Sequence, residues 1–124
     1  MEDAARAIVL AAERYNKSEP VNIGKIWIMR IKEILWIERF VTKIRKKHNV
    51  TNEEVEETLH SDALFRRVKK GKVNGEDVYV AYGRTVAGRY LFIVFVYKSY
   101  NTGLIISARD MTDKERKYYH AKKT

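Results

Sequence analysis

Residues 82–109 constrain the fold of this chain more than any other stretch. In YGRTVAGRYLFIVFVYKSYNTGLIISAR, apolar runs flank a short glycine-containing turn, and a second short connection follows them. Strands joined in this way are typical of an antiparallel meander, in which the end of one strand lies beside the start of the next. Arg84, Arg89 and Arg109 are therefore expected to gather at one edge of a sheet.

The three arginines form a candidate site for a phosphodiester backbone, because guanidinium groups bind phosphate oxygens through paired hydrogen bonds. Arg84 and Arg89 share a face of the sheet if they pair across the turn. The face of Arg109 depends on the register set by residues 99–103, since a one-residue slip reverses it. The alternative is that each arginine pairs with a carboxylate such as Asp77, Asp110 or Glu115.

The charge of the chain favours a polyanionic partner. The net charge is +9, and the acidic and basic residues of residues 1–28 cancel, so the whole excess falls on residues 29–124. Such a field attracts nucleic acid, although a basic surface can also serve solubility alone. An anionic membrane surface is less favoured, because no basic helix with a strongly apolar face is present.

Length and composition limit the remaining classes of protein. The 124 residues suffice for one domain. The chain has no cysteine, which excludes disulfides and thiolate chemistry and fits a reducing cytoplasm. The longest apolar run, residues 90–97, is far shorter than the roughly 20 residues that span a bilayer. The start of the chain shows no secretion signal pattern, so we expect a cytoplasmic protein.

Periodicity and helix-capping residues divide the chain into helices and strands. Thr51 with Glu54, and Thr112 with Glu115, form capping boxes that predict helix starts, and Asn49 is expected to end the helix before the first box. The expected helices are residues 3–16, 38–47, 52–59 and 113–122, and the expected strands are residues 29–36, 64–69, 77–83, 89–98 and 104–109, with a hairpin turn at residues 73–75. This order indicates an α+β fold with a largely antiparallel sheet of about four to five strands.

Candidates for proton transfer are fewer than candidates for charge stabilisation. His48 follows Lys46 and Lys47 at a helix end, where the three side chains can contact RNA or His48 can simply cap the helix. Glu115 and Tyr119 lie one turn apart on the last helix and can face the arginines, or Glu115 can only cap that helix through Thr112. Tyr119 is also a candidate contact for RNA.

The remaining candidates are weaker. Arg116, a candidate contact for RNA, forms a neighbouring one-turn pair with His120 on the same helix. Tyr82 and Tyr90 beside the arginine turn are candidate stacking platforms for bases, although strand alternation buries many such rings. The three histidines show no metal-ligand spacing, so neither a metal nor another cofactor is expected.

From residue 35 onward the chain resembles the BrnT family, the toxins of BrnT–BrnA toxin–antitoxin pairs. The motifs are KKHNVTNEEVEETL, YGRTVAGRYLFIVFV and IISARDMTDKERKYY, in the order of the family. The resemblance implies a RelE-like fold, a metal-independent endoribonuclease that arrests translation, and neutralisation by a BrnA-like antitoxin in a complex that can reach higher order. A non-catalytic module of the same fold, which binds RNA or antitoxin, is the alternative.

The start of the chain differs from this pattern. ARAIVLAAERYNKSEPVNIG, within residues 1–24, is similar to a stretch of NAD-dependent nucleotide-sugar epimerases and dehydratases. The chain has no glycine-rich dinucleotide fingerprint, so no epimerase activity follows, and a part of a sugar-nucleotide enzyme would have to bind a nicotinamide cofactor. We therefore divide the chain into an extension, residues 1–28, and a toxin-like domain, residues 29–124.

Overall fold

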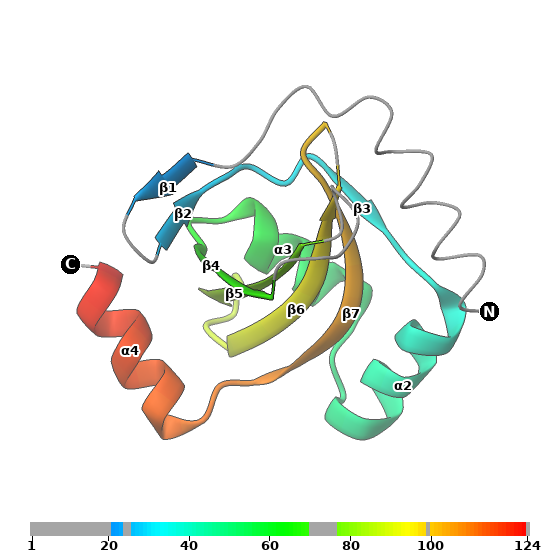
Figure 1. Ribbon diagram of the computed structural model, residues 1–124. Coiled ribbons are helices and arrows are strands. Elements are labelled where there is room, and N and C mark those ends of the chain that lie inside the picture. The colour runs from blue at the N-terminus through cyan, green and yellow to red at the C-terminus, as the bar shows by residue number, and fades with distance from the viewer. Residues whose placement is uncertain (1–20, 24–25, 70–76, 99, 124) are drawn as a thin grey trace.

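The computed structural model describes residues 21–23, 26–69, 77–98 and 100–123, and shows a curved sheet with helices on both sides (Figure 1). The helices are α2 (Glu38–His48), α3 (Asn52–His60) and α4 (Asp113–Lys123). The strands are β1 (Val21–Ile23), β2 (Ile26–Ile28), β3 (Glu33–Leu35), β4 (Leu64–Lys69), β5 (Val78–Arg84), β6 (Tyr90–Lys98) and β7 (Thr102–Asp110).

The described strands form one sheet in the order β1-β2-β4-β5-β6-β7-β3. Neighbouring strands are antiparallel, except that β3 runs parallel to β7. The predicted α+β class and largely antiparallel sheet are confirmed. The sheet has more strands than expected because β1 and β2, of three residues each, are too short to show an alternating pattern.

Residues 21–23 and 26–28 belong to this sheet, although the sequence places them in the extension. β1 and β2 pair with each other, and β2 joins the sheet where Trp27 pairs with Phe65 of β4. The expected helix at residues 3–16 and the expected hairpin turn at residues 73–75 lie outside the described residues.

The strand expected at residues 29–36 is reduced to Glu33–Leu35. The cause is topological, because β2 pairs with β4 on one flank of the central strands whereas β3 pairs with β7 on the other. Residues 29–32 must therefore cross over the sheet. Ile31, 1% exposed, packs into the core during this crossing, and the Lys32 N–H then donates to the Asn101 carbonyl at 2.7 Å.

The predicted helix caps are confirmed. The Glu54 N–H donates to the Thr51 hydroxyl at 3.2 Å, and the Thr51 N–H donates to Glu54 Oε1 at 3.0 Å, which closes the capping box of α3. Asn49 ends α2 in the left-handed conformation with φ of 53°. Asparagine tolerates that conformation better than most residues, so the chain can turn sharply from α2 into α3.

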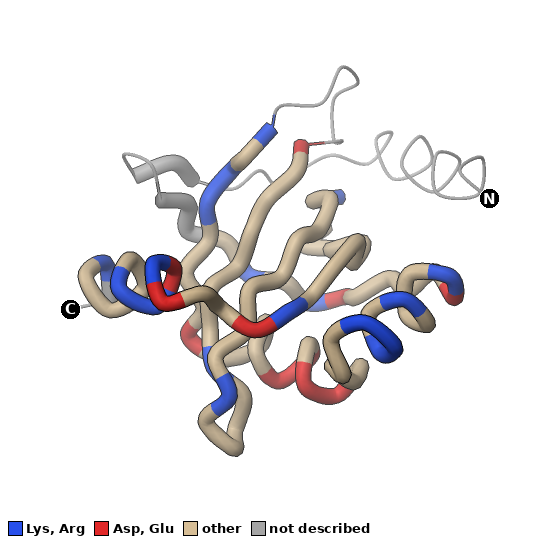
Figure 2. Tube along the Cα trace, turned by 90° about the horizontal axis from the view of Figure 1, so that it is seen from below, with Lys and Arg blue, Asp and Glu red and all other residues tan. Residues whose placement is uncertain are grey.

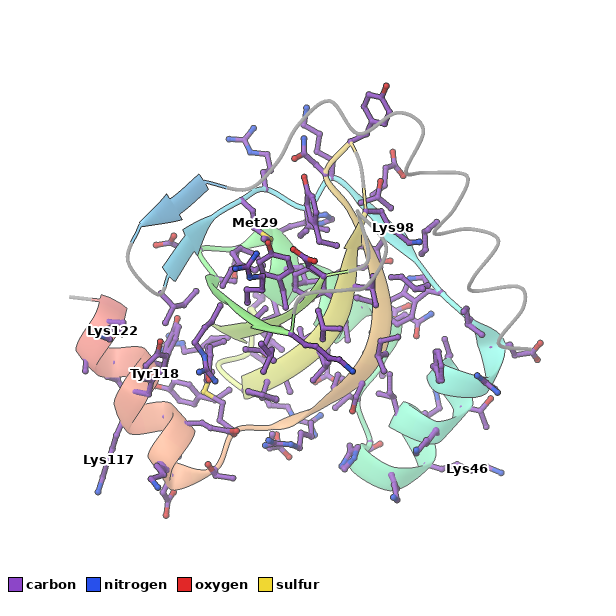
Figure 3. The ribbon with its side chains drawn as sticks, viewed as in Figure 1. Met29, Lys46, Lys98, Lys117, Tyr118 and Lys122 are labelled. Atoms are coloured by element: carbon purple, nitrogen blue, oxygen red, sulfur yellow. The ribbon has the colours of Figure 1, made fainter. Side chains whose placement is uncertain are left out.

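The sheet buries a separate apolar cluster on each face, which follows from the alternation of buried and partly buried residues along β6. The cluster on the α2/α3 face contains Ile44, Val55, Leu59, Ala81, Leu91, Ile93 and Phe95 among others. The cluster on the α4 face contains Leu64, Val80, Tyr82, Met111 and Tyr119. Tyr118 of α4 also points toward the sheet (Figure 3), with its ring centroid 5.1 Å from that of Tyr82.

The three helices differ in charge. Figure 2 shows Lys and Arg on α2 and α4, whereas α3 carries mainly acidic residues. α3 also lies very close to β5, since a Cβ atom added at Gly83 would come within 2.7 Å of Thr58 Cγ2. The acidic helix α3 therefore packs against the end of β5, next to the sheet edge that contains Arg84, Arg89 and Arg109.

Candidate active site and nucleic-acid interface

The turn between β5 and β6 places Arg84 and Arg89 on opposite faces of the sheet. Arg84 pairs with Tyr90, whereas the Arg89 carbonyl accepts a hydrogen bond from the Thr85 N–H at 2.9 Å. Residues 85–88 form the turn, in which Gly88 has φ of 94° and donates to the Thr85 carbonyl at 2.9 Å. Because Arg89 stands opposite Thr85, the two arginines do not pair across the turn, and their side chains point in opposite directions.

Arg109 shares the face of Arg84. Arg109 pairs with Phe92 in the β6–β7 ladder, and Phe92 points to the same face as Tyr90, two residues earlier. All three arginines lie at the predicted edge of the sheet. The prediction of a single three-arginine cluster is nevertheless wrong, because Arg89 lies on the α2/α3 face and the other two lie on the α4 face.

Arg89 is fully engaged in contacts with other parts of the protein. Its Nε donates to Asp110 Oδ1 at 2.6 Å and its Nη2 donates to Asp110 Oδ2 at 3.1 Å. Nη1 donates to the Asn49 carbonyl at 2.8 Å and to Glu54 Oε1 at 3.2 Å, and Nη2 donates to the His48 carbonyl at 2.9 Å. All N–H donors of this guanidinium are therefore occupied, which leaves none for a phosphate.

These contacts join the end of α2, the start of α3 and the end of β7. The Asp110 contacts raise the pKa of Arg89, and Arg89 in turn lowers the pKa of Asp110. The pKa of Glu54 is lowered mainly by the Thr51 N–H, with a smaller contribution from Arg89. The carboxylates remain ionised at neutral pH, so this network stabilises the packing of three elements.

Arg84, Tyr90 and Arg116 form the candidate site on the α4 face. Arg84 Nη1 donates to the Tyr90 hydroxyl at 3.2 Å, and Arg116 Cζ lies 4.3 Å from the centroid of the Tyr90 ring. Among the described residues, neither arginine forms an ion pair with a carboxylate. The hydrogen bond from Arg84 is the main cause of a lowered pKa of Tyr90, and Arg116 adds to it. Two guanidinium groups and an acidified phenol thus converge at the sheet edge.

Arg109 lies on the same face as this site and binds α4, the helix that carries Arg116. Its Nη1 and Nη2 donate to Glu115 Oε1 and Oε2, both at 2.8 Å, and Arg109 Cζ lies 4.3 Å from the centre of the Phe92 ring. Glu115 also closes the predicted capping box, accepting from the Thr112 N–H at 2.9 Å. Arg109 is the first cause of the lowered pKa of Glu115, which suits an anchor of α4 better than a proton acceptor.

Two of the predicted RNA-contacting tyrosines are packed inside the protein. Tyr82 is 4% exposed, its hydroxyl accepts from Arg66 Nη2 at 3.3 Å, and its ring packs edge-on against Phe92 at 5.2 Å. Tyr119 is 7% exposed and packs against Tyr90, with ring centroids 6.1 Å apart. Both rings help to fix α4 on the sheet, whereas Tyr90 itself is only partly buried.

The predicted basic residues at the end of α2 lie on the other face of the sheet. Lys46 and Lys47 are exposed, and Figure 3 shows Lys46 projecting away from the body of the protein. His48 is half-buried, and its carbonyl is held by Arg89. Because Tyr90 follows Arg89 directly, the end of α2 and the Arg84–Tyr90–Arg116 site flank the same edge of the sheet.

The structure adds His120 to the site. Its ring centroid lies 5.4 Å from that of Tyr90, and its side chain is exposed. The sequence shows His120 only as the residue one turn after Arg116, which is a weak signal. His48 lies on the α2/α3 side and His60 lies at the end of α3, so His120 is the imidazole on the face of Arg84.

Two absences hold within the described part of the chain. No three His, Cys, Asp or Glu side chains there come together in an arrangement that could hold a metal ion. None of the helices α2, α3 and α4 has the length and apolar character that a membrane-spanning helix requires.

Comparison with known protein families matches residues 36–115 to the family described as "Ribonuclease toxin, BrnT, of type II toxin-antitoxin system". A search of curated proteins found no match. The matched residues include α2, α3, the central strands β4 to β7 and the first turn of α4, and they cover more than half of the chain. The chain therefore belongs to the BrnT family of ribonuclease toxins, whose type II systems pair each toxin with an antitoxin protein.

Proposed function

We propose that this protein is a metal-independent endoribonuclease that cleaves RNA at the Arg84–Tyr90–Arg116 site. The observation that carries the proposal is the position of the Tyr90 hydroxyl beside two guanidinium groups that lack carboxylate partners among the described residues. A phosphodiester supplies the negative charge that this arrangement lacks. Residues 1–28 would then be an extension to the toxin domain of residues 29–124.

Arg84 and Arg116 would hold the non-bridging oxygens of the scissile phosphate. Negative charge grows on these oxygens when the neighbouring 2′-oxygen attacks phosphorus, and fixed guanidinium donors stabilise that charge. Loss of one such donor typically lowers the rate by a factor on the order of 10²–10³. Arg109, bound to Glu115, would hold α4 and thereby Arg116 in position.

Two proton transfers complete the reaction. His120 would accept the proton of the 2′-hydroxyl as the 2′-oxygen bonds to phosphorus, and Tyr90 would donate its proton to the 5′-oxygen as the P–O5′ bond breaks. The lowered pKa of Tyr90 favours that donation. The products are an RNA end with a 2′,3′-cyclic phosphate and an RNA end with a free 5′-hydroxyl.

Lys46 and Lys47 would bind the RNA backbone beyond the cleaved bond. They lie on the other side of the same sheet edge, on a helix whose last turn contains four basic residues. Contacts of this kind depend on charge and not on sequence, and they weaken steeply with salt. Because they lie on the opposite face of the sheet from Tyr90, they would contribute to substrate binding and not to the reaction.

A BrnA-like antitoxin would neutralise the toxin in the cytoplasm, in a complex that can contain several copies of each protein. The family supplies the antitoxin partner, and the net charge of +9 makes an acidic partner the complementary one. Neutralisation would stop the toxin from cleaving RNA and arresting translation.

Incubation of the purified protein with single-stranded RNA in EDTA tests the activity. We expect fragments that carry 2′,3′-cyclic phosphate ends, with no loss of rate when the chelator concentration is raised. RNA that is bound but stays intact would contradict the enzymatic proposal. It would favour the alternative of a non-catalytic module that only binds RNA or antitoxin, and the binding would then show a steep dependence on salt.

A further inference from the structure

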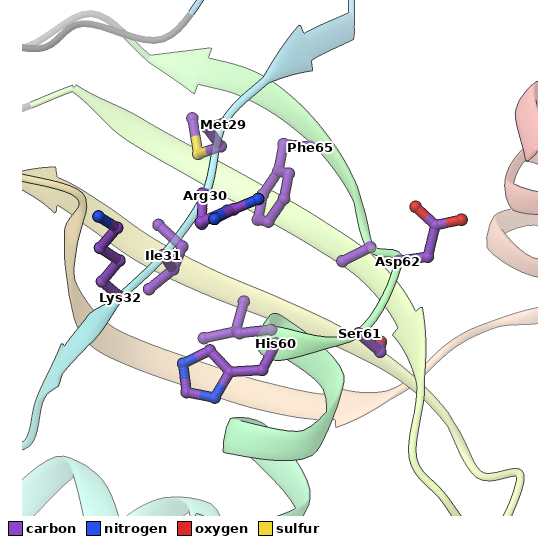
Figure 4. A pocket seen from close by; sticks show the side chains of 10 residues that line it. Met29, Arg30, Ile31, Lys32, His60, Ser61, Asp62 and Phe65 are labelled. Atoms are coloured by element: carbon purple, nitrogen blue, oxygen red, sulfur yellow. The ribbon is translucent and has the colours of Figure 1, made fainter.

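A pocket of about 500 Å³ lies on the α2/α3 face of the sheet, opposite the Arg84–Tyr90–Arg116 site. Residues 29–32, which cross over the sheet between β2 and β3, form one wall (Figure 4). The end of α3 and the start of β4 form the other wall, with residues 59–63 and Phe65. The pocket is thus a product of the crossover that shortened the strand expected at residues 29–36.

The floor of the pocket is apolar. Ile31, Leu59 and Phe65 line it and are 1%, 3% and 4% exposed, so they belong to the apolar cluster on the α2/α3 face. Met29 and Ala63 line it as well and pack against the same core. An apolar side chain inserted here would contact these residues and be removed from water.

The rim of the pocket is mainly cationic. Arg30 and Lys32 are its exposed cations, the exposed His60 imidazole lies beside them, and none of the three forms an ion pair with a residue that the structure describes. Asp62 is the acidic residue of the lining, and Figure 4 shows its carboxylate on the far side of the pocket from Lys32. Among the described residues of the lining, the charge beside Ile31 and Phe65 is therefore positive, from Arg30 and Lys32.

We infer that this pocket is a docking site for the antitoxin, which would insert an apolar side chain flanked by Asp or Glu residues. The apolar floor favours an apolar side chain in the pocket. The positive charges of Arg30 and Lys32 favour acidic residues beside that side chain. An RNA strand fits less well, because a base needs an exposed ring on which to stack, whereas the Phe65 ring is buried. This inference rests on the antitoxin partner in the proposed function and does not depend on cleavage.

The position of the pocket determines whether a segment bound there can cover the proposed active site. A segment bound there lies on the opposite face from Tyr90 and would leave the proposed active site open. The pocket would therefore contribute affinity, and a separate part of the antitoxin would have to cover the α4 face.

Fluorescence anisotropy with a labelled peptide tests the inference without RNA or cleavage. The probe is the peptide EELFEE, and the comparison peptides are KKLFKK, with reversed charge, and EESSEE, without apolar side chains. The variant Arg30→Glu/Lys32→Glu reverses the rim charge. Lys114→Glu/Lys117→Glu is the matched control, because it changes the net charge equally at exposed positions on α4.

We expect saturable binding of EELFEE only, weakened about tenfold or more by Arg30→Glu/Lys32→Glu and less than about twofold by the control. Equal binding of the three peptides, equal losses in both variants, or no binding of EELFEE would overturn the inference. Displacement of EELFEE by a single-stranded RNA hexamer, with the same sensitivity to Arg30→Glu/Lys32→Glu, would assign the pocket to RNA instead. If the protein binds EELFEE as expected but does not cleave RNA, the enzymatic proposal is contradicted and the docking site is not.

Discussion

The Arg84 guanidinium donates a 3.2 Å hydrogen bond to the Tyr90 hydroxyl across the turn between β5 and β6. The two residues are directly paired in the β5–β6 ladder, so the register of the two strands brings their side chains together. Arg116 approaches the same ring from α4. One helix and two strands therefore contribute side chains around the Tyr90 phenol, and the proposed activity depends on these contacts.

The ionisation of Tyr90 tests the contact directly. Arg84 and Arg116 favour the phenolate and lower the pKa of Tyr90, so Arg84→Ala and Arg116→Ala are each expected to raise it, with the larger effect from Arg84. The measurement is an ultraviolet titration of phenolate absorbance, from which the curve of the Tyr90→Phe variant is subtracted. An unchanged Tyr90 titration in Arg84→Ala would contradict the described geometry.

Arg89 is expected to matter for stability. Arg89→Ala removes hydrogen bonds to two carboxylates and two carbonyls, and should lower the free energy of unfolding by about 2 kcal/mol. Urea denaturation followed by circular dichroism measures the change. Arg67→Ala is the matched control, because Arg67 forms a weaker ion pair of 3.4 Å with Asp77 and should cost less than about 1 kcal/mol.

The stabilisation by Arg89 should also depend on pH. The pKa values of Asp110 and Glu54 are lowered in the folded protein, so their contribution is complete above the unfolded pKa of about 4 and is lost as the pH falls through the folded values. The difference in stability between the wild type and Arg89→Ala should therefore narrow as the pH is lowered from 7 to 3. A difference that stays constant over this range would show that the carboxylate contacts contribute little.

His120 is expected to act in the reaction and not in binding. His120→Ala should lower the single-turnover cleavage rate by a factor on the order of 10²–10⁴ while the affinity for RNA changes less than about twofold. Rapid-quench assays and filter binding separate these two quantities. His60→Ala, which removes an exposed imidazole from the other face of the sheet, should leave both quantities unchanged in the absence of antitoxin.

Asn49 tests the turn between α2 and α3. Its φ of 53° suits glycine, and its carbonyl, which accepts from Arg89, is retained in any variant. Asn49→Gly should change the unfolding free energy by less than about 0.5 kcal/mol, whereas Asn49→Val should lower it by about 1–2 kcal/mol because branching at Cβ strains this conformation. Equal effects in thermal denaturation would contradict the assigned backbone conformation.

The local structure could be predicted from the sequence where short-range chemistry determines it. Thr51 and Glu54 cap α3 because their spacing allows two reciprocal hydrogen bonds, and the long apolar runs form β5, β6 and β7 because alternation buries one face of each. The resemblance to BrnT rested on the same segments and is confirmed by the family match.

The face of Arg89 could not be predicted, because it depends on the length of one turn. Gly88 permits the turn of residues 85–88 that sets Arg89 opposite Thr85, and a shift of one residue reverses the direction of a side chain. The pairing of Arg109 with Glu115 was one of two alternatives, and only the docking of α4 decides between them. The position of His120 beside Tyr90 depends on the same docking.

Single-turnover cleavage of a labelled RNA in EDTA by the variants Arg84→Ala and Arg67→Ala tests the central claim most directly. The two changes remove the same side chain near opposite ends of the β4–β5 pair, and melting curves of both variants are the control for folding. We predict a rate about 10²–10³-fold below that of the wild type for Arg84→Ala and a rate within about twofold of it for Arg67→Ala. Wild-type cleavage by a folded Arg84→Ala protein would contradict the assignment of the active site to the α4 face.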